Sequence, residues 1–94
     1  MIIGLLTLDL CIPMCSSLKE KRRHLNALKA NLSRDFNVSV AEIGEHDKWQ
    51  AAVLAVAHVG LTRPVVDSVL SHIVAYVERF KSVEITNHQT ELIT

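Results

Sequence analysis

The chain has 94 residues, ten Lys and Arg against ten Asp and Glu, and 49% apolar side chains. This size and composition predict a single globular domain over residues 1–94, and they exclude a disordered or low-complexity protein. Because dedicated nucleic-acid binders are usually clearly basic, any contact with nucleic acid must come from a local cluster of charge.

The N-terminal twelve residues are largely apolar, but they resemble neither a signal peptide nor a membrane span. Asp9 interrupts the run, no cation precedes it, and it is too short to cross a bilayer. The two cysteines, Cys11 and Cys15, are too few for the disulfide framework of a small secreted domain. Because no second cysteine pair exists, we expect no metal, and we expect no cofactor. The lack of a signal peptide and a membrane span, together with the low cysteine count, predicts a cytoplasmic location and no membrane partner.

Apolar residues alternate along residues 2–12 and predict the first strand. Its even positions, from Ile2 to Ile12, form an apolar face, and its odd positions form a mixed face. The first helix begins at Ser17, where Ser17 and Glu20 form a capping box in which the Glu20 carboxylate would reach back to the Ser17 N–H. We expect this helix to end at residues 36–37, with Asn37 as a left-handed cap.

The sequence predicts two further strands, at residues 38–44 and 51–60. A short polar loop joins them, which predicts an antiparallel hairpin. The second helix is expected from Thr62, its cap, to about Lys81, with Pro64 in the first turn. Apolar and polar side chains alternate along residues 83–88, as they do in an edge strand. Residues 89–94 either continue this strand or fray.

The order β-α-β-β-α-β predicts an α+β, ferredoxin-like sandwich, in which a four-stranded antiparallel sheet carries both helices on one face. This topology places the turn before the first helix and the loop at 45–50 at the same end of the sheet. The uncovered face would expose the apolar residues Ile3 and Leu5, so we expect a homodimer or a larger homo-oligomer that stacks sheet on sheet. The alternative is that the C-terminal segment folds back over this face.

Positive charge is concentrated at the first helix, since residues 17–34 contain six Lys and Arg but a single acid, Glu20. Helix N-termini bind anions, and arginine offers a planar fork that matches phosphate. The candidate anion-binding or RNA-binding residues at this end are Lys19, Lys21, Arg22, Arg23, Lys48, Trp49 and Gln50. The alternatives are a solvated helix face and a Trp49 ring that covers the end of the core.

Signs of catalysis are weak, and we assign no catalytic residues. Ser16 and Lys19 match S-x-x-K without any supporting motif. Glu42, His46 and Asp47 could form an acid–base group, but polar hairpin loops commonly have this composition. The sequence favours a non-enzymatic protein.

Three segments, Ser17–Arg23, Phe36–Glu42 and Asp47–Gln50, resemble the YlxP-like family of small bacterial proteins, a domain of unknown function. The resemblance implies a ferredoxin-like fold, a cytoplasmic bacterial setting, and genes that often lie beside translation and ribosome-maturation factors. It implies no catalytic residue. We therefore expect a protein that binds RNA or the ribosome through the basic start of its first helix. The alternatives are a homo-oligomeric interaction module and a sensor of, or enzyme acting on, a small phosphorylated ligand.

Overall fold

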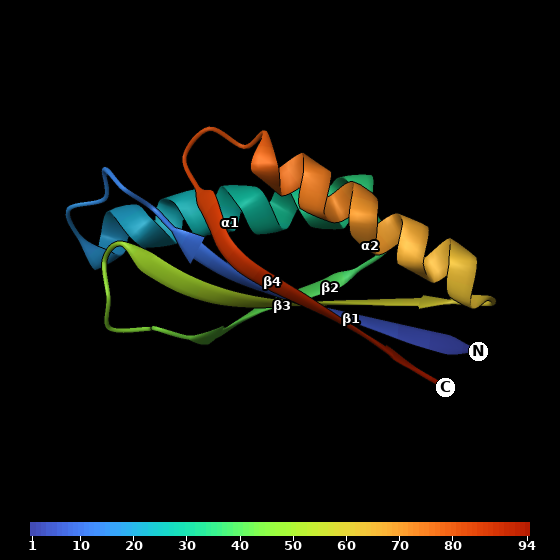
Figure 1. Cartoon of the computed structure of the whole chain (residues 1–94). Helices are drawn as coiled ribbons and strands as arrows, with labels where there is room; N and C mark the ends of the chain where they lie inside the picture. The colour runs from blue at the N-terminus through green and yellow to red at the C-terminus, as the bar shows by residue number, and fades with distance from the viewer.

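Six elements form two layers in the computed structural model, which describes all residues from 1 to 94 (Figure 1). They are β1 (Ile2–Cys11), α1 (Leu18–Asp35), β2 (Ser39–Gly44), β3 (Ala51–Gly60), α2 (Arg63–Glu78) and β4 (Glu84–Ile93). The antiparallel sheet has the order β2-β3-β1-β4, and both helices lie on the same face. The predicted ferredoxin-like α+β architecture is confirmed.

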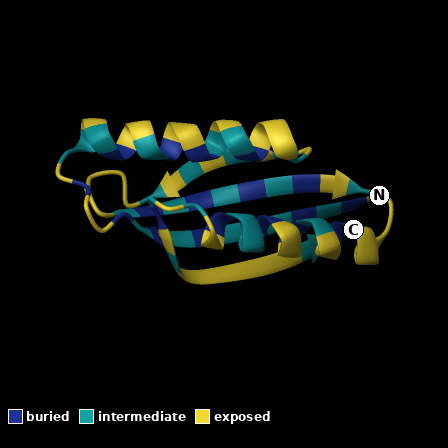
Figure 2. Cartoon of the chain, turned by 90° about the horizontal axis from the view of Figure 1, so that it is seen from above, coloured by how far each residue is buried: buried dark blue, intermediate teal, exposed yellow.

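The core lies between the helices and the sheet face formed by the even positions of β1. Leu6 and Leu8 on β1 are fully buried, as are Leu54 on β3 and Leu28 on α1. Buried positions on α1 lie on the side that faces the sheet, and its outer side is exposed (Figure 2). The alternation read from residues 2–12 therefore correctly identified the inward face.

The start of α1 is capped as predicted, with one correction. The Ser17 hydroxyl accepts a hydrogen bond from the Glu20 N–H at 3.1 Å. The Glu20 carboxylate, however, accepts from the Ser16 hydroxyl at 3.0 Å and the Ser16 N–H at 3.5 Å, and not from the Ser17 N–H. The acceptor therefore reaches one residue further back than a standard capping box requires.

α1 ends where predicted, but without the expected left-handed cap. The helix ends at Phe36, whose backbone is extended (φ −131°), and Asn37 does not adopt a left-handed conformation. The Phe36 ring instead packs edge-on against Tyr76 of α2, with the ring centres 5.8 Å apart. This aromatic contact anchors the exit from the helix where a left-handed cap was expected. At α2, Thr62 takes the cap position without a side-chain hydrogen bond.

The C-terminal residues belong to the sheet, because β4 continues through Ile93 and pairs with β1 along its length. The alternative in which this segment folds back over the uncovered face is therefore wrong. Ile3 and Leu5 remain half-buried on that face, with no element of the chain above them. No helix is both long and apolar enough to cross a membrane.

Candidate functional site

The turn before α1 and the β2–β3 hairpin lie together at one end of the sheet, as the topology predicted. The Ile12 N–H donates to the Gln50 carbonyl at 2.9 Å, which extends the pairing of β1 and β3 past the end of β1. The Gln50 side-chain amide donates in turn to the Cys15 carbonyl at 3.2 Å. Segments 35 residues apart in the chain are thereby fixed against each other.

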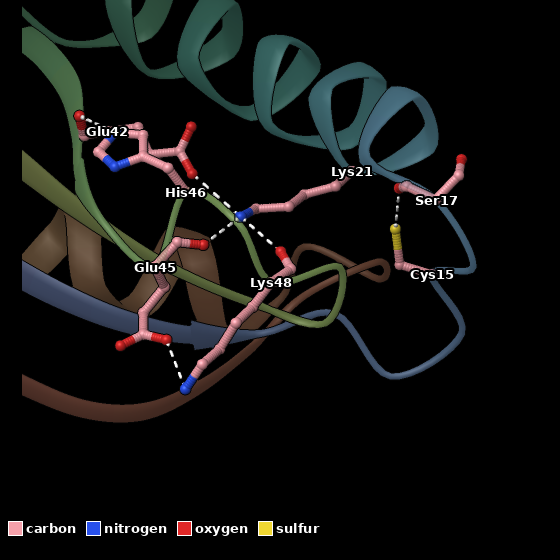
Figure 3. Close-up of polar contacts among 7 residues, drawn as sticks. All are labelled: Cys15, Ser17, Lys21, Glu42, Glu45, His46 and Lys48. Carbon is pink, nitrogen blue, oxygen red and sulfur yellow. Dashed lines mark hydrogen bonds and ion pairs between the residues drawn. The ribbon is translucent and has the colours of Figure 1, made fainter.

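The strongest link between α1 and the hairpin is the side chain of Lys21 (Figure 3). Its ammonium group donates to the backbone carbonyls of Glu45 and Lys48, both at 2.7 Å, and lies 3.1 Å from Glu42 Oε2. That buried carboxylate oxygen accepts no aligned hydrogen bond, so the ammonium is its sole polar partner. Because Lys21 is only 3% exposed, its charge is used inside the protein and is not presented to a ligand.

The helical spacing of α1 contained a signal for this role that the sequence analysis missed. Lys21 lies three residues after Leu18 and four before Leu25, and therefore falls in the stripe that faces the sheet. A charged residue in such a stripe needs a buried partner, and Glu42 on β2 supplies it. The predicted anion-binding set thus contained one residue that holds the site together from within.

The remaining cations at the start of α1 form an exposed surface. Lys19, Arg22 and Arg23, hereafter the basic surface, are exposed and make no ion pair within the chain. They are spaced i, i+3 and i+4, so they lie on one side of the helix. With Ser17, Glu20 and Asn26 they line an open hollow that has no hydrophobic side chain in its wall.

Glu20 is the single acid within this hollow. Hydrogen bonds from Ser16 lower the pKa of the Glu20 carboxyl, and the nearby positive charge of Arg23 lowers it further. The carboxylate therefore stays ionised at neutral pH, and it also lies 3.8 Å from His24 Nε2. Three cations against one carboxylate leave the hollow with a net positive charge.

The hairpin tip contributes an aromatic ring but little positive charge. Lys48 forms an ion pair with Glu45 at 2.8 Å, which raises the pKa of Lys48 and lowers that of Glu45. The Trp49 side chain is 53% exposed, so it does not seal the core. Together with Asp47, Lys48 and Gln50 it lines a second, separate hollow. The structure thus brings the tip close to the start of α1, but it does not merge the two into one pocket.

Metal ligands and reactive groups are not assembled at this end of the sheet. No three His, Cys, Asp or Glu side chains are grouped as metal ligands would be. Cys11 is half-buried, and the buried Cys15 thiol donates to the Ser17 carbonyl at 3.2 Å. The chemistry available here is that of positive charge and hydrogen-bond donors at a helix start.

Comparison with known proteins identifies relatives along nearly the whole chain. The family described as "Protein of unknown function (DUF503)" matches residues 3–90. "Uncharacterized protein YlxP" of Bacillus subtilis (strain 168) is 34% identical over 89 residues, which cover 95% of this chain and 97% of that protein.

Two solved structures share the fold at low sequence identity. The de novo designed protein Foldit4 is 9% identical with a TM-score of 0.55, over 100% of this chain and 98% of its own. A variant of SnoaB, a cofactor-independent oxygenase from Streptomyces nogalater, is 10% identical with a TM-score of 0.51, over 99% of this chain and 91% of its own. At such low identity these two likenesses show a common architecture and nothing about activity.

Proposed function

The chain belongs to the DUF503 family of proteins of unknown function, and we propose that it binds RNA, free or within the ribosome, through the basic surface on α1. The observation that carries this proposal is that Lys19, Arg22 and Arg23 are exposed, unpaired and on one side of the helix. Cations without internal partners are free to replace the counterions of a polyanion. Such a role belongs in the bacterial cytoplasm.

The position of the basic surface at a helix start adds to its suitability for phosphate. The first N–H groups of α1 and the positive end of the helix dipole lie beside Lys19. Arg22 and Arg23 supply planar forks that can each hold two phosphate oxygens. The exposed ring of Trp49 on the neighbouring hairpin offers a stacking surface for a base at the edge of the contact.

The shape of the hollow favours an extended polyanion over a small phosphorylated ligand. Sites for small ligands are usually concave and largely apolar, with a few polar groups that orient the ligand. The hollow over the basic surface is open and has no apolar wall. It can support phosphates that follow one another along a strand, but it offers no apolar wall against which the base of a single nucleotide could pack.

Titration of a labelled single-stranded RNA, followed by fluorescence anisotropy at several salt concentrations, tests the proposal. Three phosphate contacts predict a slope of about −2 for the logarithm of the binding constant against that of the salt concentration. The double variant Arg22→Ala, Arg23→Ala should bind more weakly and reduce this slope by about 1.4, since it removes two contacts.

A matched control is the double variant Arg63→Ala, Arg79→Ala. It removes the same charge from two exposed arginines, one at the start of α2 and one just after its end, that also make no ion pair. Its RNA binding should stay close to that of the wild type. Equal losses of RNA affinity in both double variants would show that binding depends on net charge alone. This result would contradict the proposed site. Co-sedimentation with ribosomes, with and without nuclease, distinguishes ribosomal from free RNA.

A further inference from the structure

The sheet face opposite the helices, hereafter the open face, differs sharply in chemistry from α1. Its side chains come from the odd positions of β1 and from the residues paired with them across the sheet. Its strands contribute Asp9, Glu84 and Glu91 but no Lys, Arg or His. At the hairpin end, the Lys48–Glu45 ion pair borders this face beside Asp9 and Val53. The negative charge of these strand residues disfavours a polyanion, and the apolar side chains beside them suit another protein surface.

Large and small side chains are separated into neighbouring strands on the open face. Ile3, Leu5 and Thr7 follow one another along β1 and form a ridge. Beside the ridge, Leu5 is paired with Ala57 and Thr7 with Ala55, and Ala41 of β2 lies beyond Ala55. The adjoining alanines form a trough one strand away from the ridge. The trough lies beside Leu5 and Thr7 and ends at Val59, which is paired with Ile3. A surface that holds a ridge beside a trough can fit a copy of itself.

The area of the open face lies at the lower limit of what a dimer needs. Four strands about 4.8 Å apart, with the longest about 33 Å long, present roughly 600 Å² in flat projection, to which the pleat adds. A standard stable interface takes about 800 Å² from each partner, and the lower limit is about 600 Å². Ile3, Val59 and Ile93 form an apolar row across three strands and concentrate the hydrophobic area at one end of this face.

From these features we propose that the open face binds a second copy of the chain around a two-fold axis that runs along the strands, between β1 and β3. Rotation about this axis places the β1 ridge of each copy over the alanine trough of the other. The twist of stacked sheets makes them diverge away from the contact centre. Asp9, four residues beyond Leu5, therefore lies near the solvated rim. The dimer has four layers, and the basic surface of each copy faces outward. The dimer proposal does not depend on the RNA proposal.

The first test is the mass of the protein in solution, measured by light scattering during gel filtration. The wild type is expected at twice the 10.5 kDa of one chain, and a monomeric wild type at micromolar concentration would overturn the proposal. Leu5→Glu should give a folded monomer. Val65→Glu, at an exposed position on the helix layer, should remain a dimer with an unchanged circular dichroism spectrum.

Two further variants test the fit of ridge and trough. Ala55→Trp adds apolar area but fills the trough, so it should also give a monomer. Because Leu5 of each copy lies near the axis, mixing Leu5→Glu with Leu5→Lys should restore a dimer that neither protein forms alone. A dimer that survives both Leu5→Glu and Ala55→Trp would place the contact elsewhere, such as the free edge of β4, and would refute the proposed interface. Failure of the two charged variants to pair would refute the two-fold geometry.

Discussion

Replacement of Lys21 by methionine tests whether this buried ammonium group holds the hairpin against α1. Methionine keeps most of the apolar stem but removes the donor to two carbonyls and the partner of Glu42. Breaking a buried ion pair from one side costs about 3–5 kcal/mol. Since the Glu42 side chain is 20% exposed and can be partly hydrated, we expect about 3 kcal/mol, at the lower end of that range. In a domain of this size, such a loss lowers the Tm by roughly 12–24 °C.

Urea denaturation followed by circular dichroism measures this loss, with Lys29→Met as the matched control. Lys29 lies on the same helix, is half-buried and has no hydrogen-bond or ion-pair partner, so its replacement should change stability by no more than about 0.5 kcal/mol. Adding Glu42→Gln to Lys21→Met should recover part of the loss, because no charge is then left unpaired. A loss below about 1 kcal/mol for Lys21→Met would refute the assigned role.

Two further predictions concern stability. At Gly4 an added Cβ would lie 2.5 Å from Val66 Cγ1 and 2.9 Å from Leu70 Cδ1, so Gly4→Ala should cost about 1–3 kcal/mol in urea denaturation; an unchanged midpoint would contradict this close approach of α2 to β1. The pKa of Glu20 is lowered from its ordinary value of 4.5, so its stabilisation is complete above that pH and is lost as the pH falls through the lower value. The stability difference between wild type and Glu20→Gln should therefore shrink below pH 4.5, and a difference independent of pH would argue against the hydrogen bonds from Ser16.

Most of the fold could be predicted from local patterns, because hydrophobic periodicity decides which face of each element is buried. The alternation from Ile2 to Ile12 identified β1 and its inward side, and the hairpin signal gave β3 its observed bounds, Ala51–Gly60. The helix ends were less predictable. Asn37 has the propensity for a left-handed cap but does not adopt that conformation. Tertiary contacts hold this segment instead: the Phe36 ring packs against Tyr76, and the Asn37 carbonyl lies 2.8 Å from His58 Nδ1.

The candidate site could be located but not fully resolved into roles. Chain topology correctly brought the start of α1 to the hairpin, because crossovers in this fold have a fixed hand. The cations of α1 looked equivalent in the sequence, yet Lys21 points inward and Arg22 outward. Lys21 is the cation that finds a buried partner, because Glu42, 21 residues away in the sequence, lies opposite it in the fold. Composition around Lys48 likewise did not reveal that Glu45 neutralises it.

The place of β1 in the sheet has a consequence for how the chain is completed during synthesis. β1 precedes the other five elements along the chain and lies in the interior of the sheet, and one of its two neighbours, β4, follows all of them. Until residues 84–93 have left the ribosome, one side of β1 has unpaired backbone groups along its whole length. Such an uncovered apolar strand readily pairs with a strand of another molecule. Chains that stop short of Glu84 should therefore aggregate, because β4 is needed to pair the second side of β1.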